Sequence, residues 1–458
     1  MKRRLFLAAG LVTAASRLHH AGSHSMAGDR SRDPQQAFNA QDAWTLAMER
    51  DKAEFLSDVG RRCYRYLVEA AHPKTGLVAD RGRTDGSQFS DCASTAACGF
   101  ALAGHGVAAN QGWVDRPSAK EHVRRMLGSL LELAQHERGF VYHFIDRGTG
   151  KRAMRCEAST IDTALMVAGA MHASQVFADD ADIVSMAGAL YRRVEWRSML
   201  GDNGCLHMGW TPESGMISHQ WDTFSELTIL VLLAIGAPTH SIPGECWNAW
   251  RRTKTLHHNG QPFLSYPPLF VHQYPHAFFD FRNVVSPSGR SYWQNSLTAH
   301  QAQIAYLKSL SQQSASLGHY GDDLWGITSS DSVAGYRDWG GPYEDGVTRP
   351  ERGIDGTVVP SAAGGALATV PEQSLRTLIY QRDHYGQKVY GRYGFTNAFN
   401  PATGWIGSDV IGIDTGITLL SAANLTNEGV WKPFMQHHAA QRALDRAGFR
   451  ATDVEALS

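Results

Sequence analysis

Two carboxylates in this sequence stand where apolar helices are expected to begin. Glu226 closes the segment Trp221–Glu226 at the start of an apolar run, and Asp414 lies in Gly412–Gly416 at the start of another. Two carboxyl groups facing one cleft can break a glycosidic bond, because one protonates the leaving oxygen while the other activates water or attacks carbon. We therefore take Glu226 and Asp414 as the candidate catalytic pair, with Asp409 as the alternative to Asp414.

Both positions also have a purely structural interpretation. Thr223 and Glu226 have the spacing of a capping box, which satisfies backbone donors at a helix start, and Asp414 could be an N-cap residue. A helix N-terminus favours an ionised carboxylate, the wrong state for an acid. Burial beside Trp221 and Phe224 would oppose that effect. The residues alone leave both interpretations open.

A second group of carboxylates is expected to bind substrate hydroxyls. Glu157 precedes a predicted helix over 161–177, and Asp162 lies in its first turn. Ser159 and Asp162 again have the spacing of a capping box, so a structural role is a close alternative. Asp222, next to Trp221, joins Glu157 and Asp162 as a predicted substrate-binding residue.

A third group lies in a segment rich in Pro, Tyr, Phe and His. His272, His276 and Asp280 recur at intervals of four, a spacing that could bind a metal on a helix. Pro275 argues against a regular helix there. We predict no metal and no cofactor, and expect these side chains to bind sugar hydroxyls. Arg282 is expected to hold Asp280 in a bidentate pair.

Two segments, 257–292 and 317–358, interrupt the helical pattern, and loops of this length are usually functional. Both place carboxylates next to aromatic residues, as a sugar-binding cleft would. Core packing is the alternative for each aromatic side chain. The candidates for stacking on sugar rings are Trp325, Trp339, Tyr343 and Tyr393.

Elsewhere, apolar residues recur at intervals of three and four, which predicts about a dozen helices and few strands. Some of these runs are apolar all round and others on one face only, as expected for buried and surface helices. The predicted helices, after a first one from about 44 to 70, cover 93–107, 123–133, 161–177, 183–194, 224–235, 293–310, 359–368, 372–385, 413–424 and 431–447. A ring of inner helices inside a ring of outer ones, an α/α toroid, fits this pattern.

The N-terminus has the pattern of an export signal. A positive start, residues 2–4, precedes the short apolar stretch Leu5–Ala15, which cannot span a bilayer as a helix. We predict a signal over 1–27, a flexible leader over 28–43 and one domain over 44–450. Export would place the protein in the periplasm or the medium.

Two export routes fit this start equally well. Arg3 and Arg4 followed by Phe6-Leu7 fit the twin-arginine pattern, while arginine pairs are also common in general secretory signals. No other stretch is apolar enough to predict a membrane span in the mature chain.

Composition excludes several classes of partner and chemistry. With 43 Lys+Arg against 44 Asp+Glu, the chain has no basic excess to bind nucleic acid. The sequence contains no phosphate loop, dinucleotide fingerprint or nucleophile elbow. The spacing of the six cysteines fits no zinc motif, so buried free thiols are expected at Cys63, Cys92, Cys98, Cys156, Cys205 and Cys246.

The ordered motifs of the chain, from about residue 50 to 449, resemble the group known as "putative glucoamylase". That group includes the β-1,2-glucanases of glycoside hydrolase family 144 and the cyclising domain of cyclic β-1,2-glucan synthases. The matching segments are Gly139–Phe144, Glu157–Leu165, Trp221–Glu226, Gly236–His240, Leu269–Tyr274 with His276, Asp280–Arg282, Asn295-Ser296, Leu324–Thr328, Asp355–Thr357, Gly391–Phe395, Ala398–Asn400 and Gly412–Gly416.

This resemblance implies a single-domain (α/α)6 toroid of six helical hairpins that hydrolyses β-1,2-glucan. It implies that Glu226 is the general acid and that the general base lies near Asp414 or Asp409. We expect an endo-acting, inverting enzyme whose partner is a glucan or glucooligosaccharide. The alternatives are a transglycosylase, an exo-acting enzyme that releases sophorose, an α-1,4 glucoamylase and a glucan-binding protein without activity.

Overall fold

The computed structural model describes residues 40–253, 255–340 and 353–452. The chain forms two compact units, residues 1–48 and 49–458, and the elements that carry the candidate site belong to the second. The predicted export signal and the leader up to residue 39 lie outside the described residues.

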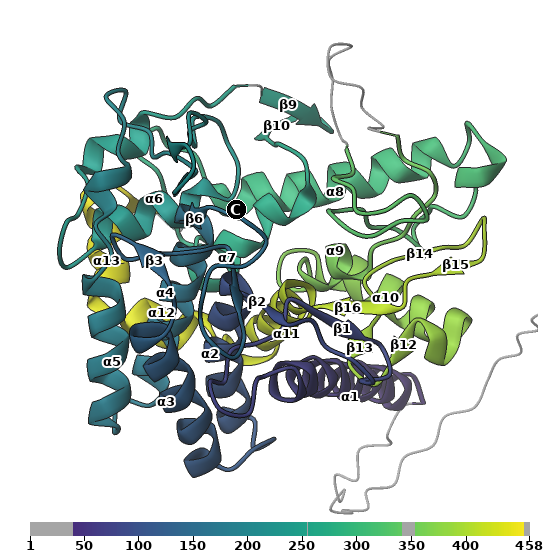
Figure 1. Ribbon diagram of the computed structural model, residues 1–458. Helices are drawn as coiled ribbons and strands as arrows, with labels where there is room; N and C mark the ends of the chain where they lie inside the picture. The colour runs from purple at the N-terminus through teal and green to yellow at the C-terminus, as the bar shows by residue number, and fades with distance from the viewer. Residues whose placement is uncertain (1–39, 254, 341–352, 453–458) are drawn as a thin grey trace, which may run out of the picture. The chain divides into compact units, whose positions relative to one another are not determined.

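The second unit is mainly helical (Figure 1). Its longer helices, the first of which starts in the other unit, are α1 (Ala40–Glu69), α2 (Thr95–Asn110), α3 (Arg116–Glu132), α4 (Thr160–Val176), α5 (Ala181–Arg192), α6 (Leu227–Gly236), α8 (Tyr292–Leu310), α10 (Pro371–Tyr385), α11 (Gly412–Asn427) and α13 (His438–Arg446). Short helices are η3 (Leu269–His272), α7 (Tyr274–Phe278), α9 (Pro360–Gly364) and α12 (Trp431–Gln436).

Four of these helices are buried on nearly all sides. Every residue of α6 is buried, and α2, α4 and α11 expose only a few residues near their ends. Helix α2 packs against α4 and α11, while α4 also packs against α5 and α6. Helices α3, α5 and α10 bury one face only. This division into inner and outer helices agrees with the predicted α/α toroid.

The contact between α2 and α4 depends on two glycines. A methyl group on Gly169 would overlap the carbonyl oxygen of Gly99, and one on Gly99 would overlap the backbone of Leu165. Any side chain at either position would therefore force the two inner helices apart.

One predicted helix is divided in the structure, and another is shortened. The predicted helix over 431–447 is divided into α12 and α13, because His437 has an extended backbone and its ring Nδ1 accepts the Ala439 N–H at 3.1 Å. The predicted helix over 359–368 is only α9, which begins at Pro360.

Short antiparallel strands lead into the inner helices. Strands β2, β6 and β16 run directly into α2, α4 and α11, respectively, and pairing with other strands fixes where each helix begins. The pairs are β1 (Arg81–Arg83) with β16 (Asp409–Ile411), β2 (Cys92–Ser94) with β5 (Phe144–Asp146), and β6 (Ala158–Ser159) with β7 (Gly209–Thr211).

The remaining strands form two-stranded sheets, except for β8 (Gly215–Met216), which pairs with β7 as the third strand of its sheet. They are β3 (His136–Glu137) with β4 (Phe140–Val141), β9 (Thr255–His258) with β10 (Gln261–Leu264), β11 (Val284–Val285) with β17 (Arg450–Ala451), β12 (Tyr390–Gly391) with β13 (Gly394–Phe395), and β14 (Phe399–Asn400) with β15 (Trp405–Ile406).

Two further properties bear on the sequence predictions. Among the described residues, no helix combines the length and the apolar character needed to cross a membrane. All six cysteines are free thiols, and Cys92 and Cys156 are the two that are only partly buried.

Candidate active site

A cavity of about 690 Å³ lies at the N-terminal ends of the inner helices α2, α4, α6 and α11. Residues from the first turns of these helices, or from the segments just before them, form part of its wall. Its lining residues are Asp80, Arg81, Ser90, Cys92, Ser94, Ala96, His143, Phe144, Met154, Ile161, Asp162, Leu165, Glu226, Phe270, Tyr274, Ser329, Tyr336, Asp338, Ile411 and Ile413.

Local sequence explains why two of these helices start at the cavity. Ser94 and Ser159 each end a short strand and cap the helix that follows, since the Ser94 hydroxyl accepts the Ala97 N–H and the Ser159 hydroxyl accepts the Asp162 N–H. Ser159 also donates to Asp162 Oδ2 at 2.5 Å. The predicted capping relation of Ser159 and Asp162 is confirmed, and it leaves Asp162 in the cavity wall.

Glu226 immediately precedes α6, and its side chain makes no capping hydrogen bond. The capping-box interpretation of Thr223 and Glu226 is therefore wrong, because the helix starts only at Leu227. Burial raises the pKa of Glu226 to about 7, and the negative charges of Asp162 and Asp338 add to that shift. A carboxyl group that keeps its proton near neutral pH is suited to general acid catalysis.

Asp414 lies in the first turn of α11, whose N-cap residue is Ile411. The N-cap interpretation of Asp414 is therefore also wrong. Burial raises the pKa of Asp414 to about 7, while a hydrogen bond from Asn397 Nδ2 to Asp414 Oδ2 at 2.6 Å acts in the opposite direction. The charge of Asp331 contributes to the rise.

Glu226 and Asp414 border connected parts of one site, although 188 positions separate them in the sequence. Asp414 lines a small void, and the residues that line both this void and the main cavity are Phe270, Tyr274, Ser329, Tyr336 and Ile413. The structure thus brings the two predicted catalytic carboxyls to the same place.

Glu157 and Asp162 flank His143 at the cavity wall. Glu157 Oε1 lies 3.3 Å from His143 Nδ1, and Asp162 Oδ1 lies 3.8 Å from His143 Nε2. Burial alone would lower the pKa of His143, but the two carboxylates raise it to about 9. The two carboxylates thus favour the protonated ring at neutral pH, and the three residues also lie close enough together to hold a metal ion.

Asp409, the alternative to Asp414, has both carboxylate oxygens near guanidinium groups. Arg83 Nη1 lies 2.8 Å from Asp409 Oδ1, and Arg81 Nη1 lies 3.5 Å from Asp409 Oδ2. Arg81 also contacts Asp80 at 3.3 Å and Asp331 at 3.1 Å. Because guanidinium groups already occupy both oxygens of Asp409, the geometry favours Asp414 over Asp409.

His272 and His276 lie in the core beside the site and not in the cavity wall. Ser296 Oγ is 3.1 Å from His272 Nδ1 and 2.8 Å from His276 Nε2. The predicted bidentate pair is confirmed, because Arg282 Nε and Nη2 donate to Asp280 at 2.8 and 2.7 Å. The contact of His272 and His276 with sugar hydroxyls stays a prediction, and the location of the two rings outside the cavity wall does not support it.

The other predicted substrate-binding residues are also outside the main cavity. Asp222 forms an ion pair with Arg251, while the indoles of Trp325 and Trp339 are buried in the core. Tyr393 is likewise buried, and its hydroxyl donates to Glu69. Core packing, the alternative considered for the aromatic residues, is what these three do. Tyr343 lies outside the described residues.

Several cavity residues were not predicted from the sequence. His143 and Tyr274 lie within motifs that carry the resemblance, and Tyr336 and Asp338 lie in the long aromatic segment, so each had a signal that pointed to its region. Arg81 had none, because its role depends on pairing between β1 and β16, which are more than 300 residues apart in the chain.

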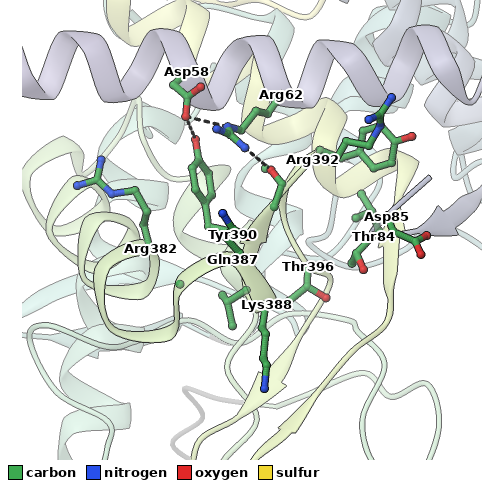
Figure 2. A pocket seen from close by; sticks show the side chains of 16 residues that line it. Asp58, Arg62, Thr84, Asp85, Arg382, Gln387, Lys388, Tyr390, Arg392 and Thr396 are labelled. Atoms are coloured by element: carbon green, nitrogen blue, oxygen red, sulfur yellow. Dashed lines mark hydrogen bonds and ion pairs between the residues drawn. The ribbon is translucent and has the colours of Figure 1, made fainter. Parts of the chain in front are cut away.

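A second hollow, of about 600 Å³, lies between α1 and the β12–β13 hairpin (Figure 2). Three arginines line it, and each has an acidic partner. Arg62 pairs with Asp58 on α1, while the other two pairs are Arg382 with Asp383 and Arg392 with Glu69. Asp58 also accepts the Tyr390 hydroxyl at 2.7 Å. Two further residues, Lys388 and Asp85, add one charge of each sign, so the hollow has little net charge.

Comparison with known proteins shows which proteins this chain resembles. The family model described as "Putative glucoamylase" matches residues 218–438. The resemblance inferred from the sequence is confirmed. A curated relative, an exo β-1,2-glucooligosaccharide sophorohydrolase (non-reducing end) from Parabacteroides distasonis, is 26% identical over 442 residues. The match covers 86% of this chain but only 57% of the relative's length.

Solved structures of the group share this fold. A glucoamylase-like protein from Bacteroides fragilis superposes with a TM-score of 0.78 at 26% identity, covering 88% of this chain and 98% of its own. An endo-β-1,2-glucanase from Chitinophaga pinensis, in complex with sophorotriose and glucose, also has a TM-score of 0.78. It is 23% identical, over 87% of this chain and 99% of its own, and so shows a common fold alone.

Proposed function

We propose that this protein is a glycoside hydrolase that cleaves β-1,2-glucan. The observation that carries the proposal is the pair of half-buried carboxyls, Glu226 and Asp414, which line adjoining parts of one site and whose pKa values are each about 7. The 26% identical sophorohydrolase supports the choice of linkage. The same relative argues against starch as the substrate, whatever the name of the group.

In the proposed mechanism Glu226 is the general acid and Asp414 the general base. Glu226 protonates the glycosidic oxygen as the bond to the anomeric carbon breaks. Asp414 takes a proton from a water that attacks that carbon from the opposite face, which inverts its configuration. After the reaction Glu226 is ionised and Asp414 is protonated. Both must therefore exchange protons with water before the next turnover.

The cavity wall also supplies groups that can bind sugar hydroxyls. Asp162, Asp338 and the protonated His143 offer acceptors and a donor. Phe270 and Tyr274 present apolar surface beside these groups, a combination typical of ligand pockets. Around this site we propose a single-domain toroid of six helical hairpins, the finer architecture that the resemblance implies.

The products can distinguish endo from exo cleavage, and hydrolysis from transfer to a sugar. Endo action is our expectation from the group as a whole, while the sophorohydrolase favours release of disaccharides from the non-reducing end. Transfer to a sugar hydroxyl instead of water would use the same carboxyls. Each alternative predicts a different set of products.

The test is incubation of the protein with linear β-1,2-glucan, followed by separation of products by size. Endo action yields a range of oligosaccharides from the first minutes, exo action yields sophorose alone, and transfer yields products longer than the substrate or cyclic ones. Starch is the substrate control and Glu226→Gln the protein control. Glucose released from starch at a comparable rate, or binding of glucan with no change in its length, contradicts the proposal.

We also propose export to the periplasm or medium, on the charge pattern of residues 2–15. Cell fractionation should find a shortened chain outside the cytoplasm. Replacement of both Arg3 and Arg4 by Lys should stop export by the twin-arginine route and leave the general secretory route intact. A full-length cytoplasmic protein contradicts export by either route.

A further inference from the structure

Asn397 is a fully buried residue between the hairpin β12–β13 and strand β14, and the substrate has no direct access to it. Its exposed fraction is 2%, and its backbone N–H donates to the Asp409 carbonyl oxygen at 2.9 Å. Burial of an amide side chain is unfavourable unless its polar atoms have partners. Both ends of this amide have one, and one of the partners is Asp414.

The contacts fix the orientation of the amide. The Asp331 backbone N–H donates to Asn397 Oδ1 at 2.7 Å, and Asn397 Nδ2 donates to Asp414 Oδ2 at 2.6 Å. Because a backbone N–H is only a donor, the atom that faces it must be the amide oxygen. The NH2 group must then face Asp414, and a flipped amide would place two donors against each other.

This orientation distinguishes the two oxygens of Asp414. Oδ2 receives the amide hydrogen and so cannot carry a proton pointing toward Asn397. A proton taken up by the carboxylate is therefore directed to Oδ1. Building on the proposed function, we propose that Asn397 is a positioning residue that makes Oδ1 of Asp414 the oxygen that accepts the proton of the attacking water.

The surroundings of Asp414 make this contact important. The Ser361 hydroxyl also lowers the pKa of Asp414, whereas the charges of Asp331 and Asp80 raise it. Arg81 pairs with both of these aspartates. Asn397 is thus a donor that stabilises the ionised base where its charged neighbours oppose ionisation.

The variants Asn397→Asp and Asn397→Ala test the proposal in opposite ways. Asn397→Asp keeps the shape of the side chain and the contact to the Asp331 N–H, but places a second carboxyl oxygen against Asp414 Oδ2, so that the pair must share a proton. Asn397→Ala removes the donor. In both, protonation of Asp414 becomes easier and the acidic limb of the kcat profile moves to higher pH.

The expected shift for Asn397→Asp is at least about one pH unit, with kcat at pH 6 lowered roughly tenfold or more, the size of effect that a close like charge produces. Asn397→Ala should shift the same limb by less. The KM for β-1,2-glucooligosaccharide and the basic limb, which reports Glu226, should change little. A merely structural role would lower stability without moving one limb selectively.

Asn400 provides a matched control in the same segment. It is 1% exposed, and its amide bonds to the Asp355 carbonyl oxygen and the Ala402 N–H, each at 3.0 Å, without touching Asp414. Asn400→Ala should lower the melting temperature but leave the acidic limb in place. An unmoved limb in both Asn397 variants, or an equal shift in Asn400→Ala, overturns the proposal.

A second measurement separates this inference from the proposed function. If the unmodified protein does not cleave β-1,2-glucan, the proposed function fails, and Asp414 can still be titrated by carboxyl ¹³C NMR, its signal being the one lost in Asp414→Asn. The pKa of that signal should rise in Asn397→Ala and not in Asn400→Ala. An unchanged pKa in Asn397→Ala overturns the positioning role whatever the substrate is.

Discussion

Glu226 in the cavity wall and Glu69, the partner of Arg392 beside the second hollow, have opposite surroundings. Burial of Glu69 is outweighed by hydrogen bonds from Arg392 and Tyr393, which keep its pKa below the ordinary value. In the cavity, Glu226 has acidic neighbours and no arginine partner among the described residues, and burial raises its pKa to about 7. The surroundings of Glu69 stabilise its ionised form, whereas those of Glu226 destabilise it.

This contrast indicates where chemistry belongs. A paired carboxylate has gained its stabilisation on folding and has little left to exchange with a substrate. A carboxyl group buried without a counter-ion keeps its proton up to a higher pH than an exposed one, and its ionisation costs stability in the folded protein. Among the described residues, Glu226 and Asp414 thus have no arginine partner, whereas each of the three arginines that line the second hollow has an acidic partner.

The largest expected effect is loss of the proton donor. Glu226→Gln keeps the shape of the side chain and removes its proton, so kcat on β-1,2-glucan should fall at least about 10²-fold, the usual contribution of general acid catalysis. Binding of glucan, measured by calorimetry, should stay nearly unchanged. Glu69→Gln in the hollow is the matched control and should retain most of the activity. Retention of activity in Glu226→Gln itself would reduce Glu226 to a structural residue.

Asp414→Asn should have an effect of similar size, because the amide cannot accept the proton of water. Turnover should again fall at least about 10²-fold. With the unmodified protein, NMR of the first product formed should show the α anomer, since an inverting reaction changes the β configuration. A β product would instead favour a retaining mechanism, with Asp414 as the nucleophile. The pair Asp409→Asn and Asp414→Asn distinguishes the two candidate bases directly.

The pH profile should be a narrow bell with its maximum near neutral pH. Glu226 must hold its proton, so activity falls as pH rises above its pKa of about 7. Asp414 must be ionised, so activity falls as pH drops below its pKa of about 7. Beyond either limb, kcat should drop about tenfold per pH unit. A broad plateau over several pH units would mean that a different pair of groups controls turnover.

Much of this site was accessible from the sequence. The apolar runs after Glu226 and Asp414 predicted inner helices, and helix N-termini at one rim place both acids at the cavity without any knowledge of the loops. The Ser159 and Asp162 cap was predictable from spacing alone, because it involves residues in one turn.

Contacts between distant segments were not predictable in this way. The buried indole of Trp325 and the Tyr393 hydroxyl that binds Glu69 depend on packing against remote elements. Composition, which suggested sugar stacking for both, carries no information on that packing. Asn397 likewise has no signal in its own neighbourhood, since its partners are residues 331 and 414.

The smallest predicted effect is on the free energy of unfolding, and it compares Glu226 with Glu69. For Glu226, the folded pKa of about 7 exceeds the ordinary value of 4.5, so the folded state binds this proton more tightly and loses stability as pH rises from about 4.5 to 7. Glu226→Gln removes that loss and should raise the free energy of unfolding at pH 8 by on the order of 2 kcal/mol. At pH 4 the same variant should gain little.

Glu69 should respond with the opposite sign. Its folded pKa lies below 4.5, so its contribution to stability is present above that pH and is lost as pH falls through the folded pKa. Glu69→Gln should therefore lower the free energy of unfolding at pH 8 by about 1 kcal/mol, the value of a partly exposed charged hydrogen bond. Urea unfolding of both variants at pH 4 and pH 8 measures the four differences. Changes of equal sign at pH 8 would remove the distinction between a site that makes charge costly and one that stabilises it.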